Sequence, residues 1–213
     1  MLTIRDLSVS IGPLPIVRGA SLALGEGEFC GLIGRNGAGK TTLLRALMGA
    51  LPATGAIELE HVNLLPLPGH RRAAHGIGYM PEDRRLVPEF TAEENVRLPT
   101  WSLRIDGAEE RLRWVYGLMP EVEKLRDRRA LVLSGGQQKL VALARALMAG
   151  TRVLLLDEPF EGLAPALARR LGEILANLKS EGVSVLMAES SAGHVEGLLD
   201  RKFRIERGSV AAG

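Results

Sequence analysis

The sequence predicts an α/β fold whose mostly parallel sheet is covered by helices on both faces. Three short apolar runs, at residues 29–33, 153–156 and 183–187, suit buried strands. Residues 137–148 and 167–178 repeat apolar side chains at helical spacing. Strands that alternate with helices form parallel sheets, and ligands bind beyond the carboxyl ends of such strands.

The first third of the chain is rich in β patterns. Apolar and polar residues alternate over 3–9, and residues 16–24 suggest a second, less regular strand. After a glycine-rich loop we expect a helix over 41–48 and a strand over 56–60. A last, half-exposed strand is expected over 202–207.

The middle of the chain has a different pattern. Residues 91–125 are mostly helical and charged in pattern, and Pro88, Pro99 and Pro120 punctuate them. We therefore expect residues 1–213 to form one domain, with a small helical subdomain at about 88–135 inserted in the α/β core.

Composition excludes several classes of protein. A chain of 213 residues suffices for one domain with a small subdomain. With 27 Lys and Arg against 25 Asp and Glu, its net charge of +2 gives no electrostatic basis for binding nucleic acid. The single cysteine, Cys30, excludes an internal disulfide and a multi-cysteine metal site. No run approaches the roughly 20 apolar residues that span a bilayer, so we expect a soluble protein that reaches a membrane only through a partner.

A glycine-rich loop with one lysine follows the first buried strand and precedes a helix. It fits the pattern G-x-x-x-x-G-K-[ST], in which backbone N–H groups and the helix N-terminus hold phosphate. The lysine would reach the outer phosphates and the threonine would bind Mg²⁺. A glycine-rich connection with an accidental lysine is disfavoured by the strand and helix that flank it. The predicted nucleotide-binding residues are Gly34, Arg35, Asn36, Gly37, Ala38, Gly39, Lys40, Thr41 and Thr42.

The apolar strand at 153–156 ends in two carboxylates. Asp157 at its tip can hold the metal, and Glu158 can orient or deprotonate an attacking water. A strand that ends in Asp-Glu could equally cap a helix. The phosphate loop in the same chain favours the catalytic interpretation.

A second helix entry, Leu133-Ser134-Gly135-Gly136-Gln137, also exposes backbone N–H groups. Ser134 is a predicted N-cap. Ser-Gly-Gly can be an ordinary helix entry, but that reading does not explain a second anion-ready terminus in a chain with one nucleotide loop.

These pieces resemble the motifs of ATP-binding cassette (ABC) ATPases: Walker A at 34–42, the LSGGQ signature at 133–138 and Walker B at 153–159. Their order and spacing match across nearly the whole chain. Further pieces are similar to the ATPase subunits of bacterial branched-chain amino-acid importers and of related urea and amide importers, at 81–88, 91–95 and 161–165. The resemblance implies a P-loop NTPase core with an N-terminal antiparallel β subdomain and an inserted helical subdomain.

The resemblance also implies head-to-tail pairing of two ATPase subunits. The phosphate loop of one and the signature of the other would enclose one ATP. Ser134, Gly135, Gly136 and Gln137 would then address the nucleotide of the partner. Residues 161–164 would cross the interface.

Three positions depart from the usual ABC pattern. Ile11 stands where many relatives stack an aromatic on adenine, and losing stacking costs roughly 0.5–1.5 kcal/mol. Glu82 replaces the glutamine that touches metal and water, and a carboxylate can still bind Mg²⁺. Ser190 replaces the switch histidine, which predicts slow hydrolysis at this chain's own site. His194 could substitute for it, although an exposed helical position is the favoured reading.

The resemblance identifies the chain as the ATP-binding and hydrolysing motor subunit of a membrane importer. ATP and Mg²⁺ are its expected cofactors. Its expected partners are a second ABC ATPase subunit, permease subunits contacted through residues 82–100, and indirectly a solute-binding protein. It would lie in the cytoplasm against the inner face of the membrane. The alternatives are a weakly hydrolysing or regulatory partner in a heterodimer, and a non-transport ABC ATPase.

Overall fold

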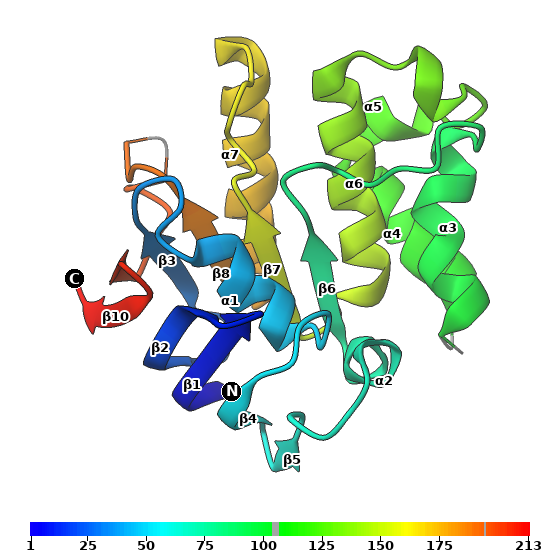
Figure 1. Ribbon diagram of the computed structural model, residues 1–213. Coiled ribbons are helices and arrows are strands. Elements are labelled where there is room, and N and C mark those ends of the chain that lie inside the picture. Colours follow the sequence, from blue (N-terminus) through cyan, green and yellow to red (C-terminus); the bar gives the residue numbers. More distant parts are fainter. Residues whose placement is uncertain (104–106, 194) are drawn as a thin grey trace.

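The computed structural model describes residues 1–103, 107–193 and 195–213, and it contains two sheets with helices packed around them (Figure 1). The N-terminal sheet is antiparallel, with strand order β2-β1-β4-β5. Its strands are β1 (Leu2–Ile11), β2 (Leu14–Leu24), β4 (Thr54–Leu59) and β5 (Val62–Asn63). The expected antiparallel β subdomain is therefore present.

The second sheet has six strands in the order β10-β9-β3-β8-β7-β6. All neighbouring pairs are parallel except β9 with β10. The strands are β3 (Phe29–Ile33), β6 (Ile77–Met80), β7 (Val153–Asp157), β8 (Ser184–Glu189), β9 (Arg201–Glu206) and β10 (Ser209–Ala212). Both β7 and β8 are buried along their whole length, as their apolar runs predict.

Helices cover both faces of this sheet, and the sheet separates two hydrophobic cores. Along β7, Leu154 and Leu156 pack in one core, while Val153 and Leu155 pack in the other. The first core contains α6 (Gly135–Ala149) and α7 (Pro165–Ser180), and the second contains α1 (Lys40–Leu47) together with the N-terminal sheet. The predicted α/β fold is thus confirmed. A short helix, α2 (Gly69–Ala74), precedes β6.

Strand β6 was not predicted, because it is only four residues long and contains a glycine. Gly78 is required by packing: a Cβ there would lie 2.1 Å from the backbone oxygen of Ala146 in α6. The residue that weakens the strand pattern in the sequence therefore allows a helix to pack directly over the strand. Strand β10, mostly exposed and antiparallel, was also not predicted.

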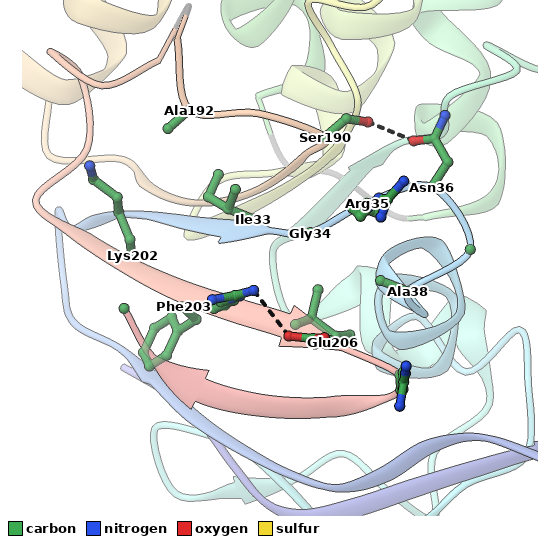
Figure 2. Close-up of a pocket in the computed structure, with 15 residues that line it drawn as sticks. Ile33, Gly34, Arg35, Asn36, Ala38, Ser190, Ala192, Lys202, Phe203 and Glu206 are labelled. Carbon is green, nitrogen blue, oxygen red and sulfur yellow. Dashed lines mark hydrogen bonds and ion pairs between the residues drawn. The ribbon is translucent and has the colours of Figure 1, made fainter.

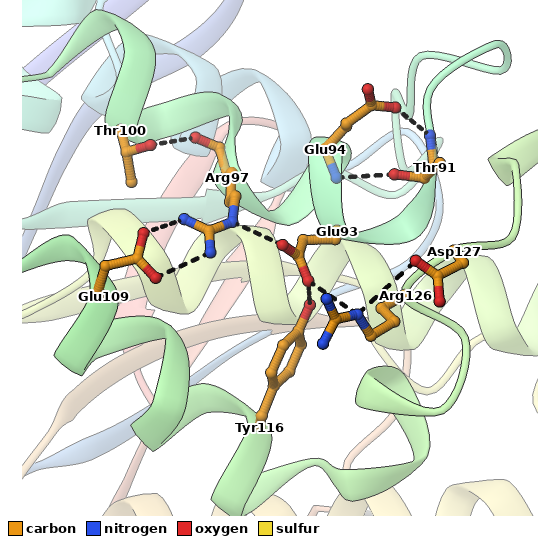
Figure 3. Close-up of polar contacts among 9 residues, drawn as sticks. All are labelled: Thr91, Glu93, Glu94, Arg97, Thr100, Glu109, Tyr116, Arg126 and Asp127. Atoms are coloured by element: carbon orange, nitrogen blue, oxygen red, sulfur yellow. Dashed lines mark hydrogen bonds and ion pairs between the residues drawn. The ribbon is translucent and has the colours of Figure 1, made fainter.

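The segment expected as a helical subdomain, about 88–135, contains α3 (Ala92–Ser102), α4 (Ala108–Leu118), α5 (Pro120–Glu123) and a 3₁₀ turn η1 (Ala130–Val132), and α6 follows it. Pro99 does not end a helix as expected, since it lies inside α3, near the end where few backbone bonds remain to be lost. Ion pairs fix α3 against α4 (Figure 3): Arg97 contacts both Glu93 and Glu109, and Glu93 also accepts from Tyr116. Among the described residues, no helix is both long and apolar enough to cross a bilayer.

Candidate functional site

The glycine-rich loop joins β3 to α1 and is held from its start. Gly34 N–H donates to the backbone oxygen of Glu189 at 3.1 Å. A Cβ at Gly34 would lie 2.3 Å from the backbone oxygen of Ile205, so only glycine fits between β3 and β9. At the other end Gly39 takes a left-handed φ of 110° as the N-cap of α1. The first N–H groups of α1 consequently point into the loop, where an anion can accept them.

Lys40 is the buried cation of this loop. Its ammonium donates to the backbone oxygens of Gly34 at 2.6 Å and Arg35 at 3.2 Å. It also lies 3.0 Å from Glu158 Oε1, and both side chains are almost completely buried. The cation that the sequence assigns to phosphate is therefore paired with the predicted catalytic carboxylate.

Asp157, at the tip of β7, lies beside Thr41 at the start of α1. The Thr41 hydroxyl donates to Asp157 Oδ1 at 3.1 Å, and the Tyr79 hydroxyl donates to Oδ2 at 3.2 Å. Burial raises the pKa of Asp157 to about 6, against the lowering effect of these two bonds. A hydroxyl and a carboxylate facing each other are hard oxygen donors, and they suit Mg²⁺. Tyr79 was missed by the sequence analysis, because it belongs to the unpredicted strand β6.

Glu158 follows with a left-handed φ of 47°, which is uncommon for a residue other than glycine. Its Oε2 lies 2.8 Å from Ser190 Oγ. The same hydroxyl lies 2.7 Å from Asn36 Oδ1 (Figure 2), so it can donate to either oxygen. Ser190 is thus adjacent to the predicted catalytic carboxylate and to the glycine-rich loop, which is the position expected for the switch residue.

The cleft around Lys40 has a volume of about 210 Å³. Its lining residues are Asn36, Gly37, Gly39, Lys40, Thr41, Thr42, Glu82 and Glu158. Glu82 is exposed, and its pKa is raised by partial burial and by the neighbouring carboxylates of Glu161 and Glu158. A cation that bound here would relieve this repulsion. The cleft therefore brings the N-terminus of α1 and Lys40 together with carboxylates that a cation would bridge.

A larger cavity of about 730 Å³, drawn in Figure 2, shares Asn36 and Gly37 with this cleft. It is lined by residues 33–38, by Ser190 and Ala192, by 202–207 and by Gly213. Lys40, Thr41 and Glu158 do not line it. Of the predicted site residues, 34–38 line this cavity, whereas Lys40, Thr41 and Glu158 line the smaller cleft.

Ile11 lines neither of these two cavities. It ends β1, pairs with Leu14 across the hairpin and is 54% exposed. Its role against adenine stays a prediction. His194 lies outside the described residues.

The signature residues begin α6, and the predicted N-cap is confirmed. Ser134 Oγ accepts from the N–H of Gln137, while Gln137 Oε1 accepts from the N–H of Ser134, a reciprocal capping box. Neither these two residues nor Gly135 and Gly136 line the cleft around Lys40. The chain therefore has a phosphate cleft and a separate signature helix that takes no part in it.

Comparison with known proteins gives a consistent result. Residues 17–161 match the family model described as ABC transporter. The high-affinity branched-chain amino acid transport ATP-binding protein BraG of Pseudomonas aeruginosa is 36% identical, over 99% of this chain and 91% of BraG. The lipopolysaccharide export system ATP-binding protein LptB of Escherichia coli K12 is 33% identical, over 99% of this chain and 89% of LptB.

Solved structures agree. An ATP-binding cassette of an ABC transporter in its ADP conformation has a TM-score of 0.86 and 27% identity, covering 100% of this chain and 89% of that one. A dimeric bacterial ABC transporter cassette has a TM-score of 0.87 and 25% identity, covering 99% and 96%. The chain therefore belongs to the ABC transporter family, as one of its ATP-binding subunits.

Proposed function

We propose that the chain is the ATP-hydrolysing motor subunit of a membrane importer for branched-chain amino acids or a related small polar solute. The observation that carries this proposal is the similarity to BraG, which extends over 99% of this chain. The similarity to LptB keeps an exporter as the second candidate, because it covers as much of the chain at 33% identity.

The geometry supports hydrolysis of a phosphoanhydride. The α1 N-terminus and Lys40 would bind the phosphates, and Thr41 and Asp157 would hold Mg²⁺ with Glu82 nearby. The metal would neutralise charge on the phosphate oxygens. Glu158 is placed to accept a proton from water once the Lys40 ammonium has left it to bind phosphate.

The isolated signature supports pairing with a second ABC ATPase subunit. Ser134 and Gly135 begin a capped helix but do not line the chain's own cleft. In a head-to-tail pair they would face the partner's nucleotide, and the partner's signature would complete the site at Lys40. The dimeric bacterial cassette that this fold resembles is consistent with such a pair.

An apolar surface near the signature supports docking to a permease. Trp101, Leu131 and Val132 are large hydrophobic side chains at least 59% exposed. They cluster around the 88–90 loop: Leu131 N–H donates to Pro88 O at 3.0 Å, and the Phe90 ring lies 5.7 Å from that of Trp101. A cytoplasmic loop of a permease is the occupant we propose, which would hold the chain at the inner face of the membrane.

Ser190 favours a slow site. A serine hydroxyl can bond to phosphate but cannot become a cation as histidine can. In a heterodimer, a partner that has the histidine would then supply the faster of the two sites.

Two measurements test the proposal. Phosphate release and ATP-dependent dimerisation of the purified chain are compared with those of Lys40→Ala; a native chain as inactive as this variant in both would refute the motor function. Uptake of radiolabelled leucine, isoleucine and valine is then compared in cells lacking the chain and in cells complemented with native or Glu158→Gln chain. Uptake unaffected by the deletion, with ATPase activity intact, would reject the solute and favour export or a non-transport role.

A further inference from the structure

Helix α6 contains a buried lysine that the predicted site does not use. Lys139, the residue that directly follows the signature at 133–138, is only 8% exposed. Its ammonium donates to the backbone oxygen of Glu158 at 2.8 Å and to that of Glu161. Both acceptors lie in the segment that leaves the Walker B strand. A single side chain thus joins the signature helix to the backbone of the predicted catalytic carboxylate.

Burying the Lys139 ammonium costs hydration free energy, which its hydrogen bonds must offset. Burial lowers the pKa of Lys139, against the opposing effect of Glu161 and Glu189. A buried ammonium is tolerated where carbonyl and carboxylate oxygens replace water around it. Here its two bonded acceptors are carbonyls of one turn, and Glu161 N–H also donates to Glu158 O at 3.2 Å.

The turn that Lys139 holds is strained. Glu158 has a left-handed φ of 47°, a conformation that brings the Cβ of a residue other than glycine too close to the backbone. Such a conformation persists only where surrounding bonds fix it. Besides Lys139, Glu158 N–H donates to Ala188 O at 2.9 Å, and Phe160 N–H donates to Glu189 Oε1 at 3.1 Å. Lys139 adds two bonds from α6 to these.

We propose that Lys139 is a positioning residue that holds Glu158 and the 158–161 turn in register with the signature helix. The inference rests on the proposed function, in which the signature serves the partner's nucleotide while Glu158 serves the chain's own. A signature helix seated on the partner's phosphate would thereby set the carboxylate of its own chain. Lys139 couples the two composite sites.

The helix does not depend on Lys139 for its place. A Cβ at Gly136 would lie 2.3 Å from Leu167 Cδ2, so the start of α6 packs tightly against α7 through a different contact. Most of α6 is also buried in the first core. Removing the ammonium should therefore leave the fold intact and affect the turn.

The test compares three variants in the assembled ATPase. Lys139→Met removes the ammonium at similar length, Lys139→Arg keeps a cation, and Lys124→Met removes an exposed lysine at the end of α5. Phosphate release is titrated with MgATP to obtain kcat, KM and the Hill coefficient, and Tm is recorded for each. We expect Lys139→Met to lower kcat about 10- to 100-fold, because misplacing a catalytic group by an ångström has effects of that size. KM should change less than about twofold, since the phosphate-binding groups are untouched.

The Hill coefficient of the Lys139→Met assembly should fall toward unity, Lys139→Arg should recover most of kcat, and Lys124→Met should match the native chain. Unchanged kcat and Hill coefficient in Lys139→Met would overturn the proposal, as would a rise in KM that accounts for the whole loss. Should Lys139→Met fail to fold, Lys139→Gln is tested against the same criteria. A native assembly that hydrolyses ATP without cooperativity overturns the coupling alone, whereas a native assembly without hydrolysis refutes the proposed function itself.

Discussion

Glu189, the last residue of β8, is a buried acid whose ionisation should control stability near neutral pH. It is 6% exposed, and its Oε1 accepts from Phe160 N–H. Burial raises its pKa from 4.5 to about 7, with a further contribution from Glu158 and against the effect of the Phe160 bond and Lys139. Between pH 4.5 and 7, Glu189 therefore keeps its proton in the folded chain and releases it in the unfolded chain.

The sign and size of the effect follow from this difference. Between pH 4.5 and 7 the folded state binds more protons than the unfolded state, so the free energy of unfolding falls as pH rises through that window and levels off above it. In the variant Glu189→Gln the side chain is neutral at every pH, and its amide oxygen can still accept from Phe160. From pH 5 to pH 8 the native chain should lose roughly 2–3 kcal/mol relative to the variant.

Urea unfolding of both chains at pH 5, 6, 7 and 8 measures this difference. The exposed Glu26→Gln serves as the control for loss of a surface carboxylate, and its profile should run parallel to the native one. Parallel profiles for native and Glu189→Gln would show that Glu189 is ionised in the folded chain throughout, and the reasoning from burial would be wrong.

Three further predictions concern Asn95 in α3 and two residues beside the glycine-rich loop, Ser190 and Gly34. Asn95→Leu should lower the free energy of unfolding by about 3 kcal/mol. The fully buried amide of Asn95 bonds both the N–H and the C=O of Val87, and leucine would leave these two groups unpaired. Urea unfolding measures the change, and a loss below about 1 kcal/mol would contradict the prediction. Ser190→His should raise kcat for phosphate release by up to about 10²-fold, and no gain in any assembly would show that the serine is not limiting. Gly34→Ala should abolish ATP binding, measured by calorimetry, and cost about 1–3 kcal/mol of stability, because its Cβ would meet Ile205 O at 2.3 Å. Its control, Gly172→Ala in α7, has open space around the new Cβ and should be stabilised by about 0.5–1 kcal/mol.

Much of the fold was predictable because local pattern and burial coincide. The apolar run at 29–33 matches β3 residue for residue, and the serine and glutamine of the signature form the capping box that their spacing allows. Such features depend on neighbours in the sequence. Periodicity and capping chemistry are sufficient to find them.

The rest depends on contacts between distant segments. Tyr79 reaches Asp157 only because β6 and β7 pair in parallel, and β6 contains a glycine that packing with α6 requires. Lys139 follows the polar residues of the signature, so nothing in the local pattern shows that its ammonium is buried against the 158–161 turn. The role of such a residue can be recognised only once the fold shows which backbone oxygens lie beside its side chain.

The polar side chains around Lys40 are already bonded to one another, and nucleotide would have to exchange these bonds for its own. Lys40 is paired with Glu158, Thr41 donates to Asp157, and Ser190 bonds to Glu158 or Asn36. Phosphate and metal would therefore replace protein–protein bonds as well as water, which limits the net gain from binding. The same exchange has a catalytic consequence. A phosphate that takes the Lys40 ammonium would release Glu158 Oε1 from its ion pair, so that this oxygen could accept a proton from water. The step that binds the substrate would thereby also free the proton acceptor.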